Sequence, residues 1–294
     1  MNKCTFAFVG LLTLLAACGK NEKETPNGLK YTVLKAGDGV TPKTKEIIVF
    51  DWELRDSNDS VWQETFKDGI PSPAQIADSS QLANEDGLTQ MLRMLSKGDS
   101  VRTEMSMKEY FGKRGGPVPP EIDSTLTMAF TIKVRNIMPE AEFQSFMEEE
   151  YKKRELKIFD KDTKDIGKYL SDQNLAARVD TSGLQYILHN STGGKKPTPD
   201  DCVEVKYKGT FLKTGQVFDQ QQRIAFPLNG VIDGWKLGIP MLGKGDSATF
   251  FVPSKLAYGP QGYPGAIPPD AILIFNVTLL DVKDEFDQET RTCK

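Results

Sequence analysis

The sequence of 294 residues contains one histidine, His189, and four cysteines. A single histidine excludes every site that needs two imidazoles, such as a His-Glu-x-x-His zinc site, and it leaves one chance for a Ser-His or Cys-His pair. The net charge of −4 provides no positive field that would attract nucleic acid. We therefore expect neither a metal site nor a nucleic-acid partner.

The first 17 residues have the pattern of a secretory signal. Lys3 supplies the positive charge, and the apolar stretch of residues 5–15 is shorter than the ~20 residues of a membrane-spanning helix. It ends in LAACG (residues 15–19), which resembles a bacterial lipobox with Cys18 as the lipidated residue. The alternative is an ordinary secretory signal cleaved at an Ala-x-Ala-like site. We expect a lipid-anchored protein of the bacterial envelope, in the outer membrane or facing the periplasm, with residues 18–27 as a flexible tether.

Two cysteines remain in the folded part once Cys4 has left with the signal and Cys18 carries the lipid. Cys202 and Cys293 could pair, but Cys293 lies in a charged tail. The favoured interpretation is that Cys202 is a small apolar residue of a strand.

The chain contains an internal repeat. Residues 28–31 (GLKY) recur as residues 183–186 (GLQY), 155 positions later. Residues 94–100 (MLSKGDS) recur as residues 241–247 (MLGKGDS). Ordered matches with small changes of offset indicate one fold used twice, over residues 28–138 and 183–283.

Each copy has the pattern of an antiparallel sheet. Val203, Val205 and Tyr207 alternate with polar residues, which is the period of a strand with one buried face. The GKGD of residues 243–246 predicts a turn between strands. One short helix is predicted from Asp233, its N-cap, to about residue 241. The expected fold class is α+β, a sheet packed against one short helix.

The segment between the copies, residues 139–182, has apolar residues near helical spacing among many Glu, Lys and Asp. Gly167 and the charged residues 160–165 predict its division into two helices. One interpretation is a rigid spacer or a helix that joins two copies of the chain as a homodimer. The other is a linker helix packed on one domain, since a single apolar stripe satisfies either. Residues 284–294 form a C-terminal tail.

Five short motifs in the second copy carry a family resemblance: YKGT (207–210), GQVFD (215–219), VIDGW (231–235), LAYG (256–259) and GAIPPDA (265–271). Over about residues 183–282 the sequence resembles the FKBP-type peptidyl-prolyl isomerases. The resemblance implies a twisted antiparallel sheet around a short helix with an apolar pocket between them. Through the internal repeat, we expect two FKBP-like domains joined by the helical linker.

The resemblance also implies a role for each site residue. Trp235 would form the floor under a substrate proline, Tyr258 would donate its hydroxyl to a substrate carbonyl, and Asp219 would lie at the rim. These three are the expected catalytic residues, and the Ile232 N–H would be a second donor. The expected substrate-binding residues are Tyr207, Phe218, Phe226, Val231, Ile232, Ile267 and Phe275. Taken singly, an aromatic residue such as Trp235 or Phe275 would be interpreted as an ordinary residue of the hydrophobic core.

The first copy has lost most of these groups. At the positions that correspond to Trp235, Asp219 and Tyr258, the first copy has Leu88, Gln63 and Phe111. At the positions that correspond to Val231 and Ile232 it has Asn84 and Glu85. A domain that keeps its core without its pocket serves either to bind clients or to space the second domain from the membrane.

The expected function is prolyl cis/trans isomerisation without a cofactor, acting on proline-containing folding proteins of the envelope, together with chaperone activity. The family resemblance also implies macrolide inhibitors. A non-catalytic peptide-binding chaperone that uses the same pocket is the alternative, and a structural surface lipoprotein is the third.

Overall fold

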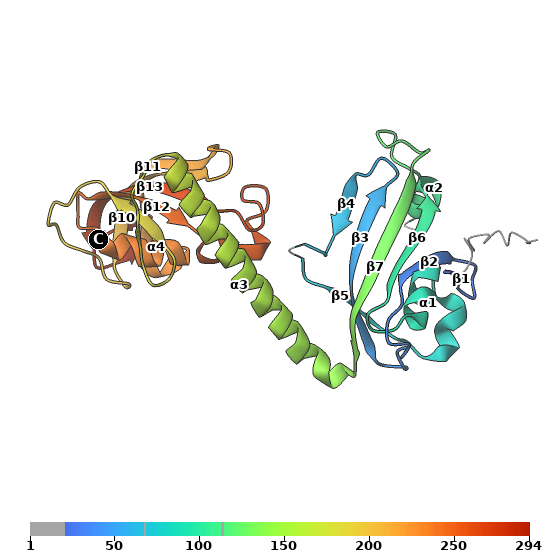
Figure 1. Cartoon of the computed structure of the whole chain (residues 1–294). Coiled ribbons are helices and arrows are strands. Elements are labelled where there is room, and N and C mark those ends of the chain that lie inside the picture. The colour runs from blue at the N-terminus through green and yellow to red at the C-terminus, as the bar shows by residue number, and fades with distance from the viewer. Residues whose placement is uncertain (1–20, 68, 113–114) are drawn as a thin grey trace, which may run out of the picture. The chain divides into compact units, whose positions relative to one another are not determined.

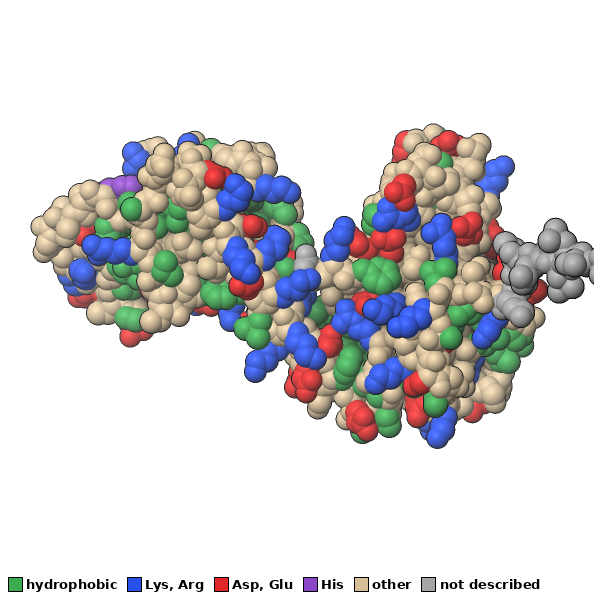
Figure 2. Space-filling view, in the orientation of Figure 1, with side chains coloured by type: hydrophobic (Ala, Val, Ile, Leu, Met, Phe, Trp, Pro, Cys, Tyr) green, Lys and Arg blue, Asp and Glu red, His purple; other side chains and the backbone are tan. Residues whose placement is uncertain are grey.

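The computed structural model describes residues 21–67, 69–112 and 115–294. The chain divides into two compact units, of which the first ends at Tyr151 and the second is Lys152–Lys294 (Figure 1). The predicted signal and Cys18 lie outside the described residues. Within the described ranges, no helix is both long and apolar enough to cross a membrane. Figure 2 shows side chains of both charge signs intermixed over the visible face.

The second unit is built on a six-stranded sheet with the strand order β11-β10-β13-β12-β9-β8. Val203 and Val205 are buried, as are Phe275, Val277 and Leu279, so the predicted alternation is confirmed. The strands are β8 (Arg178–Val179), β9 (Gln185–Leu188), β10 (Cys202–Phe211), β11 (Val217–Pro227), β12 (Ser247–Val252) and β13 (Leu273–Lys283).

The predicted short helix is present as α4 (Asp233–Gly238), followed by a 3-10 turn, Ile239–Met241. The expected cap is wrong. Ile232 occupies the N-cap position, and Asp233 lies in the first turn with its carboxylate 3.0 Å from the ammonium of Lys236. Further 3-10 turns in this unit are Leu228–Gly230, Ser254–Leu256 and Gly259–Gln261.

The first unit repeats this topology. Its order β1-β2-β6-β7-β3-β4, with β5 also paired to β3, corresponds strand for strand to β8-β9-β12-β13-β10-β11. The strands are β1 (Glu22–Glu24), β2 (Lys30–Lys35), β3 (Ile47–Asp56), β4 (Val61–Glu64), β5 (Ser72–Gln75), β6 (Ser100–Ser106) and β7 (Thr127–Met138). The helices are α1 (Gly87–Met94) and α2 (Met107–Gly112), with a 3-10 turn at Ser79–Asn84.

Local details repeat as well. The β10–β13 ladder has a register shift between Glu204 and Val205, and the β3–β7 ladder has one at the corresponding step, between Val49 and Phe50. Irregularities at matched positions are difficult to explain without a common fold.

The GDS turn is held in the same way in both units. Asp246 accepts hydrogen bonds from the N–H groups of Thr192 and Gly243, and Asp99 accepts them from those of Gly37 and Ser96. The N–H groups of Thr192 and Gly243 hold the pKa of the Asp246 carboxyl below its ordinary value.

One part of the expected tether is ordered. Glu22–Glu24 form β1, which pairs antiparallel with β2 so that Lys23 lies opposite Tyr31. The polar composition suggested a flexible segment, but backbone hydrogen bonds to an open sheet edge do not depend on apolar side chains.

The connector is one helix rather than two. α3 (Glu140–Asp172) runs without a break through Gly167. Ion pairs between residues four apart support its charged stretch, among them Lys161–Asp165 and Lys168–Asp172. Its apolar stripe serves both units, since Met147 is buried with Ile47 and Val49 in the first, and Ile166 with Phe251 in the second.

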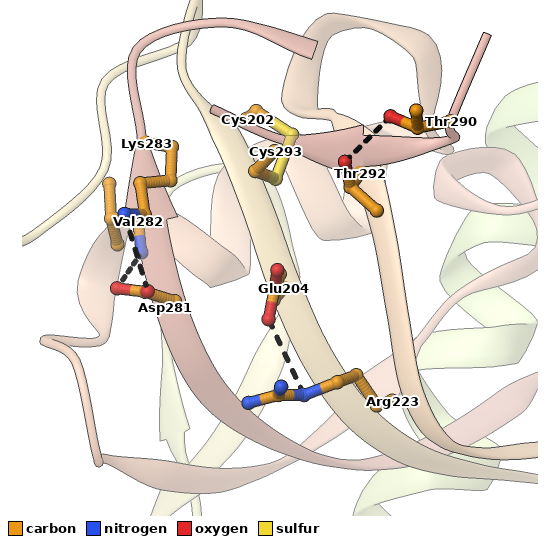
Figure 3. Close-up of a disulfide and its surroundings, with 9 residues drawn as sticks. All are labelled: Cys202, Glu204, Arg223, Asp281, Val282, Lys283, Thr290, Thr292 and Cys293. Carbon is orange, nitrogen blue, oxygen red and sulfur yellow. Dashed lines mark hydrogen bonds and ion pairs between the residues drawn. A yellow bond between two sulfur atoms is a disulfide. The ribbon is translucent and has the colours of Figure 1, made fainter. Parts of the chain in front are cut away.

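The C-terminal tail forms a disulfide with the second sheet, contrary to the favoured interpretation of Cys202. The hairpin of β14 (Phe286–Asp287) and β15 (Thr292–Cys293) brings Cys293 to Cys202, with the two Cα atoms 5.5 Å apart (Figure 3). The charges of the tail do not prevent this, because Asp287 and Lys294 pair within the hairpin at 2.9 Å while Glu289 and Arg291 lie exposed at its turn. The bridge spans 91 positions of sequence.

Removing this bridge should destabilise the second unit. A cross-link that closes so long a loop contributes about 2–5 kcal/mol to the free energy of unfolding. We expect Cys202→Ala/Cys293→Ala to lower that free energy in denaturant titrations by an amount in this range. Reductant should lower it similarly in the unaltered chain and leave the double variant unchanged. If reductant leaves the free energy of unfolding of the unaltered chain unchanged, the pairing of Cys202 with Cys293 is contradicted.

Candidate isomerase site

The site is an aromatic cluster on the inner face of the second sheet, around Trp235. The indole is 5 % exposed, and its ring centre lies 5.0 Å from Tyr207, 5.1 Å from Phe275 and 5.4 Å from Phe226. Edge-to-face contacts dominate, as expected of aromatic packing. Residues from β10, β11, β13 and α4 thus pack together, as the family resemblance implied.

The cluster keeps an accessible apolar side. Trp235, Phe275 and Ile267 are buried in the core of this unit, while the remaining predicted residues pack against them and stay partly exposed. Those partly exposed residues are Tyr207, Phe218, Phe226, Val231 and Ile232. The site therefore has a rigid floor with walls that a ligand can contact.

Gly209 makes room for one wall. A Cβ atom at Gly209 would lie 2.5 Å from the ring of Phe218, closer than such contacts occur. Phe218 in turn packs edge-on against Phe275, with ring centres 5.6 Å apart. The glycine of the YKGT motif is thus explained by the close approach of an aromatic ring to the strand backbone.

Asp219 is held at the rim by Tyr207. The Tyr207 hydroxyl donates a hydrogen bond to the Asp219 carboxylate. Burial of the phenol, and then its bond to the carboxylate, raise the pKa of Tyr207 above its ordinary value. Tyr207 therefore contributes both a ring to the wall and the donor that orients Asp219.

Tyr258 lies at the edge of the site with 36 % of its surface exposed and its ring 5.9 Å from that of Tyr263. Burial, followed by the negative charge of Asp219, raises the pKa of Tyr258. A phenol with a raised pKa stays protonated at neutral pH and remains a hydrogen-bond donor.

Two further donors belong to the site. Within the described part of the chain, the N–H of Ile232 at the start of α4 has no hydrogen-bond acceptor. The buried indole Nε1–H of Trp235 also lacks a partner there. Unsatisfied donors in a folded protein are costly and are characteristic of ligand-binding sites.

Sequence reasoning missed one member of the site. Phe211 packs on Phe218 with ring centres 5.0 Å apart, and its position at the end of β10 was the available signal. His189 is exposed, with its Nε2 2.8 Å from the Thr249 hydroxyl. Over the described residues, no group of His, Cys, Asp and Glu is arranged to hold a metal ion.

The corresponding positions of the first unit are differently occupied. Leu88 lies where Trp235 does, partly buried between two apolar clusters. The indole N–H groups of Trp52 and Trp62 are bound, to Ser72 and to Asp56.

Comparison with known proteins supports the resemblance of the second unit. The profile of the FKBP-type peptidyl-prolyl cis-trans isomerase family matches residues 193–280. The isomerase FkpA of Escherichia coli is 30% identical over 203 residues, covering 68% of this chain and 70% of that protein. FkpA of Aeromonas hydrophila is 44% identical over 106 residues, 35% of this chain and 39% of its own length. The crystal structure of E. coli FkpA aligns with a TM-score of 0.37 at 32% identity, and the alignment covers 49% of this chain and 71% of that one.

The chain belongs to the FKBP-type peptidyl-prolyl cis-trans isomerases. It spans less than half the length of the A. hydrophila relative, and the family profile matches only the second unit.

The raised pKa values of Tyr207 and Tyr258 predict late ionisation. In an absorbance titration at 295 nm, both phenols should ionise above their ordinary value near 10 in the folded chain and return to it in denaturant. Their contribution to stability is fully present below about pH 10 and is lost as the pH rises through the folded values. Tyr207→Phe and Tyr258→Phe should each remove one late-ionising group. A variant titration that matches the unaltered chain would contradict the assignment.

Proposed function

We propose that the second unit catalyses cis/trans isomerisation of Xaa-Pro bonds at the cluster around Trp235. The observation that supports this most is the combination of a buried indole floor, partly exposed aromatic walls and hydrogen-bond donors without internal acceptors. A proline ring matches such a surface in polarity, and the donors match the carbonyl groups that flank it.

The reaction needs no nucleophile, base or cofactor because no bond breaks. Rotation about the Xaa-Pro bond is opposed by ~18–20 kcal/mol, which derives from amide resonance. Water favours the polar planar amide, and an apolar site removes that stabilisation. The twisted amide has lost its resonance and suffers less from desolvation, so the site favours the transition state over the ground state.

The residues divide the work. Trp235 supports the proline ring, and Tyr207, Phe218, Phe226, Val231, Ile232, Ile267 and Phe275 enclose it. Tyr258 and the Ile232 N–H donate to substrate carbonyls, which steadies the rotated amide. Asp219, oriented by Tyr207, places a negative charge at the rim beside the polarised amide.

The proposal extends to the whole chain. The first unit, with the same strand order and register shift, is an FKBP-like domain that has lost the isomerase groups, and residues 28–138 and 183–283 are the two domains. Cys18 anchors the protein by lipid in the bacterial envelope, where folding proline-containing proteins are the substrates. Tyr151 and Leu156, both more than half exposed on α3, offer apolar surface for a homodimer.

Single substitutions should separate these roles in a protease-coupled assay with an Ala-Leu-Pro-Phe peptide. Tyr258→Phe removes one donor worth about 0.5–1.5 kcal/mol, so kcat/KM should fall about twofold to tenfold. Trp235→Leu, which copies the first unit, should abolish most of the activity because the floor is lost. Tyr151→Phe, an exposed tyrosine of α3, is the matched control and should leave kcat/KM unchanged.

The same variants distinguish the alternatives. If calorimetry shows that the chain binds the peptide, and micromolar chain does not accelerate isomerisation, the protein is a non-catalytic binding module. A chain that neither binds nor accelerates, but loses stability in Trp235→Leu, would be a structural protein.

Lipid attachment is tested separately. Expression in a bacterial host with labelled palmitate should label the chain and recover it in the membrane fraction. Cys18→Ser should abolish both results, because the thiol that carries the lipid is missing. Cys4→Ser, a cysteine of the same leader, should leave labelling intact. An unlabelled, soluble parent chain would favour the ordinary secretory signal.

A further inference from the structure

Tyr258 lies at the end of a short segment that is in contact with α3. The segment begins with the 3-10 turn Ser254–Leu256, soon after β12 ends, and Tyr258 follows two positions after the turn. The turn is closed by a hydrogen bond of 2.9 Å from the Leu256 N–H to the Pro253 carbonyl. A shift of this turn would therefore move the phenol that donates to the substrate in the proposed mechanism.

The start of the turn is capped by Asp162 of α3. One carboxylate oxygen of Asp162 accepts hydrogen bonds from the Ser254 N–H, at 2.8 Å, and from the Ser254 hydroxyl, at 2.5 Å. Asp162 and Ser254 are each 1 % exposed. Pro253, the N-cap residue of the turn, has a side chain without an acceptor. The first N–H of the turn therefore depends on the helix for its hydrogen bond.

The carboxylate of Asp162 is costly to bury. Burial raises the pKa of the Asp162 carboxyl, and the hydrogen bonds from Ser254 act in the opposite direction. Two nearby aspartates of α3, Asp160 and Asp165, are instead exposed and pair with lysines of the same helix. Asp162 thus differs from its neighbours on the helix, since its carboxylate is buried and bonded to a distant segment, as expected of a group that fixes two elements in one relative position.

A second contact with α3 holds the other side of the same loop. The Arg154 guanidinium forms an ion pair with the Asp270 carboxylate, and both of its terminal nitrogens donate to that carboxylate. Asp270 in turn donates its N–H to the Gly259 carbonyl at 2.9 Å. Gly259 directly follows Tyr258, so segments held by α3 flank the tyrosine on both sides.

The first unit supports the equivalent turn in another way. There Met107 lies at the position of Ser254, and Phe111 lies at that of Tyr258. Met107 is buried in an apolar cluster, and its N–H donates to the Leu126 carbonyl of the same unit at 3.0 Å. The carboxylate cap from α3 therefore occurs in the unit that keeps the isomerase tyrosine.

We propose that Asp162 is a positioning residue of the isomerase, which acts through Ser254 to hold Tyr258 at the edge of the site. This inference rests on the proposed function, since it concerns how one of the proposed donors is held. The second half of α3 is then part of the frame of the site as well as a connector. A donor that is fixed before the substrate arrives stabilises the rotated amide without being ordered during the reaction.

A double-mutant cycle on the full chain tests this role in the protease-coupled assay. Asp162→Ala removes the acceptor, so kcat/KM should fall about twofold to tenfold, the loss expected when the Tyr258 donor is removed. In the Tyr258→Phe background the same substitution should cause no further fall, because the group that it positions is absent. Asp162→Asn keeps an acceptor oxygen and should retain most of the activity. Asp160→Ala, at an exposed aspartate of α3, is the matched control and should leave kcat/KM unchanged.

The absorbance titration of the tyrosines gives a measurement that does not depend on activity. In Asp162→Ala, Tyr258 should ionise closer to its ordinary value of about 10 because the phenol becomes less buried, while Tyr207 should still ionise late. Asp160→Ala should leave the ionisation of both unchanged. A general loss of stability would instead lower kcat/KM equally in the two backgrounds and leave the ionisation of Tyr258 where it was.

Equal falls of kcat/KM with and without the Tyr258 hydroxyl would overturn the proposal, and so would an unchanged kcat/KM in Asp162→Ala. If far-UV circular dichroism shows that Asp162→Ala does not fold, Ser254→Ala replaces it in the cycle and in the titration. Ser254→Ala removes one of the two hydrogen bonds, and the same outcomes decide. A parent chain without isomerase activity would overturn the proposed function, and the titration of Tyr258 would then decide whether Asp162 positions the tyrosine.

Discussion

The antiparallel pairing of β10 with β13 is the constraint on which the site depends. It sets Gly209 opposite Phe275 and Tyr207 opposite Val277, so that the aromatic side chains of both strands point to the same inner face. Because side chains alternate along a strand, a slip of one residue would turn all of them outward. The bare backbone at Gly209 then admits the ring of Phe218, and the cluster closes around Trp235. Stability and the proposed chemistry therefore rest on one register.

The first unit has the same strand register as the second but different side chains at the equivalent of the site, so the register alone does not determine function. Its β3–β7 ladder sets Leu54 opposite Phe130 and keeps the same register shift. Phe130 and Phe275 are thus equivalent, yet one lines an open cavity and the other lies beneath an indole. The differences lie in side chains on α1 and in the segment after β6, and these segments carry no ladder hydrogen bonds. Substitution there changes the surface without disturbing the sheet.

Period-two patterns predicted the strands and ordered matches indicated the repeat, because both are local signals. The membership of the aromatic cluster was implied by the family resemblance. It did not predict the Cys202–Cys293 bridge, since pairing depends on how a charged tail folds back across 91 positions. The division of α3 at Gly167 was also wrong. A glycine costs a helix only about 1 kcal/mol, and ion pairs and the burial of Ile166 and Leu170 outweigh it. The cavity of the first unit escaped prediction because its equivalent is filled in the second.

The chain has a single histidine, and the groups around Trp235 are of a kind that donates hydrogen bonds rather than transfers protons. Proton transfer requires a group whose pKa lies near the working pH, and histidine is the usual choice. Near Trp235, burial raises the pKa of two tyrosines, Tyr207 and Tyr258, away from neutral pH and keeps both phenols protonated. Such groups hold hydrogen bonds constant rather than move protons. A site of this kind suits a reaction governed by shape and solvation, in which the substrate rotates and nothing ionises.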